Sequence, residues 1–166
     1  MKRFIYLSLF LTITGITYTG CIKEKIFPAE PSLEFKEFVK YDSVQGGVLT
    51  LAAADCILKF KDGDGDLGGD DAKAIVMKYL YKNTDGNYVY YDANGANPGF
   101  DTLMAYYKIP DVTPQGQYKA LEGEIKVKMT APIAAPFHSF FKYEITIRDR
   151  AGNISNVATT DEIANP

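Results

Sequence analysis

Apolar and polar residues alternate along most of the chain after residue 32, and this period of two is the pattern of half-buried β-strands. The segment LEGEIKVKM, residues 121–129, places its aliphatic residues on one face and its glutamates and lysines on the other. The segment FKYEITIRD, residues 141–149, repeats this arrangement. Alternation and strand-forming composition predict about seven or eight strands, drawn from residues 32–41, 47–60, 74–82, 87–92, 102–109, 124–129, 141–148 and 154–160.

Turn signals separate these segments, and helical spacing is scarce. Asp85 and Gly86 lie between 74–82 and 87–92, so these two segments are expected to pair as a hairpin. A length of 166 residues with 46% hydrophobic residues is ordinary for one folded domain. The sequence therefore predicts an all-β fold, an antiparallel β-sandwich that occupies residues 33–166.

The segment YEITIRDRAGNIS, residues 143–155, resembles the last hairpin of fibronectin type III and related immunoglobulin-like domains. The resemblance implies an immunoglobulin-like order of strands. In that order the loop between the second and third strands lies at the same end of the molecule as the loop before the last strand, so residues 62–71 and 148–153 are expected to meet. The matching positions are Tyr143, Ile145, Ile147, Gly152 and Ser155.

The N-terminus has the pattern of an export signal. Lys2 and Arg3 precede about ten mostly apolar residues, and small residues follow before Cys21. This pattern predicts a signal peptide over residues 1–20, and the apolar run is shorter than the roughly 20 residues of a spanning helix. An ordinary secretory signal that ends near a cysteine is the alternative.

The residues YTGC, ending at Cys21, resemble the lipobox of bacterial lipoproteins, with Tyr18 where an aliphatic residue is usual. The resemblance implies that Cys21 is lipidated and becomes the N-terminus of the mature chain. Residues 21–32 then form a tether between the domain and a membrane. Cys56, on an alternating segment, is expected to be a lone core thiol, and a disulfide between Cys21 and Cys56 is the alternative.

The segment KFKDGDGDLGGDD, residues 59–71, places five aspartates within ten positions. Calcium takes six to eight hard oxygen ligands, and glycine lets a backbone curl around the ion. An EF-hand is excluded, because Leu67 and Lys73 stand where that loop needs glycine and glutamate. The stretch predicts a calcium site built by loops, whose candidate ligands are Asp62, Asp64 and Asp66, joined by Asp70 or Asp71 and by Asp149 from the facing loop.

Two other interpretations of the aspartate stretch stay open. Lys61, Arg148 or Arg150 would neutralise it in a salt-bridged loop. Alternatively, the stretch is a solvated turn, because Asp-Gly is common turn chemistry.

The lipobox, the segment FKDGDGDLG and the turn RDRAGN together resemble those of a group of small Bacteroidetes lipoproteins. The resemblance implies an outer-membrane lipoprotein of the cell envelope that faces either the periplasm or the cell surface. The one partner that the resemblance implies is a membrane, to which the protein is attached through lipidated Cys21.

Composition and motifs narrow the function classes. A formal charge of −3 without a basic cluster argues against a nucleic-acid binder. His138 is the sole histidine, and the adjacent Ser139 would face the opposite side of a strand, so no catalytic pair is expected and the protein is predicted not to be an enzyme.

Two functions remain. The first is a lipid-anchored structural or interaction module, stabilised by calcium, with a protein partner. The second is a carbohydrate-binding module that feeds a glycan-uptake system, with sugar rings stacked on exposed aromatic side chains. The residues that favour the second are Tyr79, Tyr81, Tyr88, Tyr90, Tyr91, Tyr106 and Tyr107.

Overall fold

The computed structural model describes residues 26–91, 102–115, 118–130 and 138–165. Every regular element in these ranges is a β-strand. Accordingly, no helix in the described part of the chain has the length and apolar character that crossing a bilayer requires. The predicted signal peptide, Cys21 and the first residues of the predicted tether lie outside the described residues.

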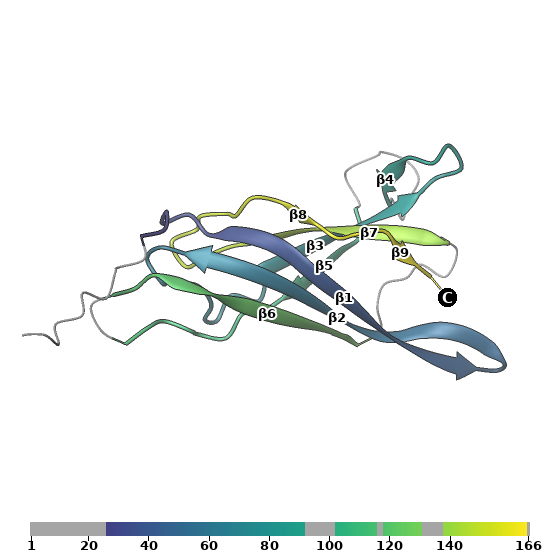
Figure 1. Ribbon diagram of the computed structural model, residues 1–166, viewed down its shortest axis with the longest axis horizontal. Helices are drawn as coiled ribbons and strands as arrows, with labels where there is room; N and C mark the ends of the chain where they lie inside the picture. Colours follow the sequence, from purple (N-terminus) through teal and green to yellow (C-terminus); the bar gives the residue numbers. More distant parts are fainter. Residues whose placement is uncertain (1–25, 92–101, 116–117, 131–137, 166) are drawn as a thin grey trace, which may run out of the picture.

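Two antiparallel sheets form the fold (Figure 1). The smaller sheet has three strands in the order β1-β2-β6. The larger sheet has six described strands. Four of them follow the order β4-β3-β7-β8, while β5 pairs with β3 and β9 pairs with β7. The strands are β1 (Ser32–Gln45), β2 (Val48–Asp62), β3 (Ile75–Lys82), β4 (Tyr88–Tyr90), β5 (Met104–Tyr107), β6 (Leu121–Thr130), β7 (Phe140–Ile147), β8 (Ala158–Thr159) and β9 (Ile163–Ala164).

The division of the strands confirms the predicted immunoglobulin-like sandwich. The first two strands share a sheet with β6, while β3 pairs with β7 in the other sheet, as in the two sheets of an immunoglobulin domain. The chain therefore crosses from one sheet to the other between β2 and β3, and the aspartate stretch makes this crossing. The described chain has nine strands where seven or eight were predicted, because the two-residue β9 is too short to show alternation.

Alternating residues of both sheets build the core. Cys56 and Leu58 from β2 face Tyr143 and Ile145 from β7, and all four are fully buried. Tyr79 of β3 joins them, with its ring stacked on Phe141 at 5.4 Å between centroids. Cys56 is a free thiol, as expected of a lone core cysteine, and burial raises its pKa to about 12.

Strands β1 and β2 make a long hairpin of 14 and 15 residues. It turns at Gly46 and Gly47, both at positive φ, and its register slips between Phe35 and Glu37 and between Tyr41 and Asp42. Such bulges sharpen the twist of a strand pair. Figure 1 shows the turn of this hairpin at one end of the molecule, whereas β2 runs to the opposite end, where the aspartate loop begins.

The aspartate loop, residues 63–74 between β2 and β3, passes close to the backbone of other segments. A Cβ at Gly63 would meet the carbonyl oxygen of Phe27 at 2.3 Å, and one at Gly68 would meet that of Pro110 at 1.9 Å. Gly69 donates a backbone hydrogen bond to Ile109 at 2.9 Å. Glycine is needed here for close approach, so the loop is a junction and not a free turn.

We expect Gly68→Ala to cost more stability than Gly86→Ala, although both glycines lie at a similar positive φ, 89° and 83°. Nothing lies within 4 Å of a Cβ at Gly86, so that change costs about 1–2 kcal/mol of backbone strain alone. At Gly68 the clash with Pro110 adds about 1–3 kcal/mol. Urea unfolding of both variants measures the difference, and equal losses would contradict the close approach.

Candidate metal site

Four carboxylates meet where the aspartate loop approaches the loop after β7. Asp62 ends β2, Asp64 and Asp66 follow it in the loop, and Asp149 comes just after β7. Each offers an oxygen, and the four oxygens lie within 4.8 Å of one another. Asp62 is fully buried and Asp149 is 5% exposed, whereas Asp64 is exposed and opens the cluster to solvent. The predicted meeting of the two loops is confirmed.

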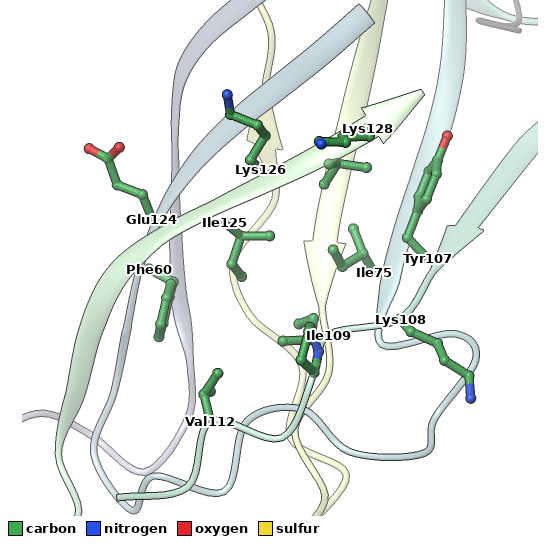
Figure 2. A pocket seen from close by; sticks show the side chains of 12 residues that line it. Phe60, Ile75, Tyr107, Lys108, Ile109, Val112, Glu124, Ile125, Lys126 and Lys128 are labelled. Carbon is green, nitrogen blue, oxygen red and sulfur yellow. The ribbon is translucent and has the colours of Figure 1, made fainter. Parts of the chain in front are cut away.

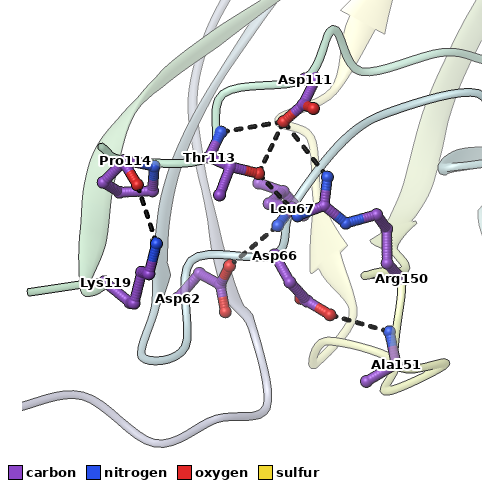
Figure 3. A network of polar contacts seen from close by, with 9 residues as sticks. All are labelled: Asp62, Asp66, Leu67, Asp111, Thr113, Pro114, Lys119, Arg150 and Ala151. Carbon is purple, nitrogen blue, oxygen red and sulfur yellow. Dashed lines mark hydrogen bonds and ion pairs between the residues drawn. The ribbon is translucent and has the colours of Figure 1, made fainter. Parts of the chain in front are cut away.

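Backbone amides hold the two loops together and orient the carboxylates (Figure 3). The amide of Ala151 donates to Asp66 Oδ2 at 2.9 Å, across 85 positions of sequence. The amide of Leu67 donates to Asp62 Oδ2 at 3.2 Å. The backbone and side-chain amides of Asn153 donate to the two oxygens of Asp149 at 2.7 and 2.8 Å. Outer donors of this kind fix ligand orientation in metal sites.

Two oxygens of the cluster lack such a donor. Oδ1 of Asp62 and Oδ1 of Asp66 are buried, and neither accepts a hydrogen bond from a described residue. A buried carboxylate oxygen without a partner destabilises the fold, because it has lost its hydrogen bonds to water and gained none in the protein. These two oxygens therefore favour a cation between the carboxylates.

The electrostatics of the cluster point the same way. Burial raises the pKa of Asp62 to about 6, and the neighbouring charge of Asp64 adds to the effect. Burial, followed by the charges of Asp149 and Asp64, also raises the pKa of Asp66. The amide of Ala151 and the guanidinium of Arg150 oppose this increase only in part. At neutral pH the ionised cluster is under repulsion that a divalent cation would reverse.

The three cations predicted to neutralise the loop do not pair with the four clustered carboxylates, although Arg148 does pair with another aspartate of the loop, Asp71. Arg148 pairs with Asp71 at 2.7 Å, and Arg150 pairs with Asp111 at 3.2 Å. The ammonium of Lys61 lies over the ring of Phe27, 5.6 Å from its centroid. In the described residues, then, no ion pair reaches the four carboxylates. The solvated-turn interpretation is wrong, since Asp62 and the adjoining loop residue Leu67 are fully buried.

The structure does not bring Asp70 to the cluster. Asp70 is exposed, and Asp71 faces Arg148 and accepts the amide of Lys73. Asn153 and the amides of Leu67 and Ala151 were not foreseen as orienting groups. The turn RDRAGN offered a signal for Asn153, because an aspartate at a turn commonly accepts a nearby backbone amide.

The tyrosines do not form an open aromatic platform. Tyr79 is fully buried, while Tyr88 and Tyr90 lie beneath ammonium groups of Lys142 and Lys78 at 4.6 and 5.9 Å from their ring centroids. His138 stacks on Tyr81 at 3.8 Å, and its Nδ1 lies 3.4 Å from the hydroxyl of Tyr79. Lysines and a histidine therefore cover ring faces that a sugar would need.

Without divalent ions, we expect protonation of Asp62 to stabilise the fold. A folded-state pKa raised from 3.8 to about 6 means that this stabilisation is present at low pH and is lost as the pH rises through about 6. It amounts to at most about 3 kcal/mol. His138 acts in the opposite sense, because burial lowers its pKa.

The measurement is urea unfolding in chelator at pH 7 and pH 5, for the parent and for Asp62→Asn. The variant keeps His138 and lacks the titrating carboxyl, so the parent should gain stability relative to Asp62→Asn as the pH falls. Parallel pH profiles for the two proteins would contradict a raised pKa at Asp62.

Comparisons with protein-family models, with curated protein sequences and with solved structures find no match to this chain. What the cluster does must therefore follow from its own geometry: four convergent carboxylates, two of them with buried oxygens that lack donors, which can hold a metal ion.

Proposed function

We propose that this protein is a lipid-anchored structural or interaction module of the cell envelope, and that calcium bound by Asp62, Asp64, Asp66 and Asp149 stabilises its sandwich. The calcium site rests on one observation: the four carboxylates converge, and two of them have a buried oxygen that accepts no hydrogen bond from a described residue. The lipobox-like residues before Cys21 support the anchor.

The donor set favours calcium over other common ions. Zinc sites in proteins draw on histidine and cysteine, which are absent from the cluster. Magnesium usually keeps several waters and takes only one or two carboxylates, whereas calcium accepts many carboxylate oxygens in a flexible shell. Two ligands on opposite sides of calcium are about 5 Å apart, because each lies about 2.3–2.6 Å from the ion. The separations of up to 4.8 Å fit this span.

Calcium at this place would stiffen the end of the sandwich where the chain enters it. The carbonyls of Phe27 and Pro28, just before β1, lie against Gly63 in the aspartate loop. The loop also contacts Pro110 and, through Asp66, the turn at Ala151. One ion would thus tie together the entering segment, the crossing between the sheets and the loop after β7. In an anchored protein this is the end nearest the tether.

The far end offers a surface for an interaction. The β1–β2 hairpin projects there, and Tyr41 and Val44 are exposed on it, at 48% and 69%. A module that is rigid near its anchor can hold such a hairpin at a fixed distance from the membrane. Carbohydrate binding has less support, because Tyr79 is buried and a face of each of the Tyr81, Tyr88 and Tyr90 rings is covered by His138 or a lysine.

Calcium should raise the melting temperature of the parent by several degrees relative to chelator. At a free concentration a hundredfold above Kd, binding to the native state adds about 2.7 kcal/mol. Asp62→Asn and Asp149→Asn should abolish most of this increase, because each removes a ligand. Asp70→Asn, in the same loop but outside the cluster, is the matched control and should respond to calcium as the parent does.

Melting is followed by differential scanning fluorimetry in calcium, magnesium and chelator. An identical melting temperature for the parent in calcium and in chelator would exclude the metal site. A loss of the calcium response in Asp70→Asn equal to that in Asp62→Asn would show that general loop charge, not the cluster, is responsible.

The anchor has its own test, which does not depend on calcium. Cys21→Ser should move the protein from the membrane pellet to the supernatant of lysed cells, because no acyl chain can be attached. Cys56→Ala, which changes the buried thiol, should leave the protein in the pellet. If Cys21→Ser stays in the pellet, the lipid anchor at this cysteine is wrong.

A further inference from the structure

Strand β6 is the terminal strand of the three-stranded sheet, and Figure 1 shows it on the outer side of β2. It is ten residues long, contains no proline, and pairs with β2 in an unbroken register from Leu121 to Thr130. Natural edge strands are usually short or bulged, interrupted by proline or inward-pointing charges, or lined with exposed charges, lysine above all. In the part of the chain that the structure describes, β6 has only the last of these devices, its exposed charges, so a strand that pairs with its outer edge must complement those charges.

The outward face of β6 has an ordered charge pattern. Two glutamates, Glu122 and Glu124, are followed by two lysines, Lys126 and Lys128, and all four are exposed. The neighbouring strand already complements this order, with Lys61 opposite Glu122, Lys59 opposite Glu124 and Asp55 opposite Lys128. Opposite charges on directly paired residues stabilise a sheet. Within its own sheet, β6 makes ion pairs of Glu124 with Lys36 at 2.6 Å and of Lys126 with Asp55 at 3.3 Å.

We propose that the outer edge of β6 pairs with β6 of a second copy of this chain, antiparallel and centred on Ile125. In this register Glu122 faces Lys128 of the second copy, and Glu124 faces Lys126 of the second copy. Two-fold symmetry repeats both pairs, so four opposite-charge pairs form. The apolar positions also match, since Ile125 faces its own copy and Leu121 faces Met129. The two small sheets become one continuous six-stranded sheet.

No neighbouring register does as well. Centring the pair on Glu124 places that glutamate against itself, and centring it on Lys126 places that lysine against itself. A two-fold axis that falls between two residues is also excluded. It would pair each charged residue of one copy with an apolar residue of the other, so that the charged side chains of one strand and the apolar side chains of its partner would share one face of the sheet. The charge order and the alternation of β6 therefore select one isologous arrangement.

An apolar pocket of about 380 Å³ gives this edge a place to bury side chains. Its lining includes Phe60, Ile75, Ile109 and the five consecutive β6 residues from Glu124 to Lys128. Because residues from both faces of β6 line it, the pocket runs along the strand edge. Figure 2 shows Ile125 pointing into the pocket, while Glu124 and Lys126 project from the opposite side of the strand. Ile125 of the second copy would point the same way and cover the opening.

Covalent trapping suits this contact, since an edge-to-edge pair buries a modest area and exchanges readily. The test uses the full chain with Ile125→Cys, exposed to a mild oxidant and analysed on a non-reducing gel. Directly opposed residues of antiparallel strands have Cα atoms about 4.5–5.5 Å apart, within disulfide range. Lys128→Cys is the control, because its two copies would lie roughly 20 Å apart in the proposed register. Disulfide-linked dimer should form with Ile125→Cys and not with Lys128→Cys or the parent.

The charges test the register in the same Ile125→Cys chain. Lys128→Glu places a glutamate opposite Glu122 of the second copy, and two-fold symmetry repeats this like-charge pair. Glu122→Lys does the same with lysines, so each variant should lower the cross-linking rate roughly tenfold. Combining Glu122→Lys with Lys128→Glu restores opposite charges and should recover the rate. The recovery separates pairing from damage to the fold, because the double variant loses both matches within its own sheet, to Lys61 and to Asp55, whereas each single variant loses only one.

Circular dichroism and melting confirm that each variant is folded. Absence of disulfide dimer from folded Ile125→Cys overturns the proposal, as do equal yields from Ile125→Cys and Lys128→Cys. If the double charge exchange cross-links no faster than the single variants, the register is wrong.

Discussion

Four carboxylates held within 4.8 Å of one another set the constraint on which one end of this molecule depends. Two unit charges at 4 Å repel by about 1 kcal/mol in bulk water and by about 4 kcal/mol at the effective dielectric of a protein surface. Summed over the pairs in the cluster, this repulsion rivals the whole stability of a typical domain, about 5–15 kcal/mol. A fully ionised cluster without a counter-charge is therefore not sustainable, and a proton or a cation must relieve it.

The loop cannot relieve this repulsion by opening, because its backbone is packed against three other segments. Gly63 lies against Phe27 and Pro28, and Gly68 lies against Pro110. The amide of Ala151 holds Asp66 from the far side. Splaying the carboxylates apart would break these contacts together, so ion binding and the folding of this end are coupled. Metal-binding energy in such a site is folding energy.

Alternation along the chain was sufficient to predict eight of the nine described strands, because most of them expose one face and bury the other, whereas the two-residue β9 is too short to show the pattern. The meeting of Asp62 with Asp149 followed from the resemblance to immunoglobulin-like domains, which places two loops at one end. Spacing alone could not tell which aspartates converge. Gly68 and Gly69, at φ of 89° and 117°, redirect the chain, and Asp71 beyond them faces Arg148 instead of the cluster. Close approach to Pro110 requires that turn, and no local pattern shows a contact so distant in sequence.

The two proposals together restrict how the protein can sit on a membrane. The segment that would lead to the proposed anchor enters at the aspartate end, and an antiparallel β6 pair would place the aspartate ends of the two copies at opposite ends of the dimer. Both anchors can reach one membrane only if the strands lie along its surface, with the two-fold axis perpendicular to it. A monomer can instead stand on its tether and hold the β1–β2 hairpin away from the lipid. Pairing through β6 would thus change the orientation of the protein from upright to parallel with the membrane. Calcium would keep the end near the tether rigid in both orientations.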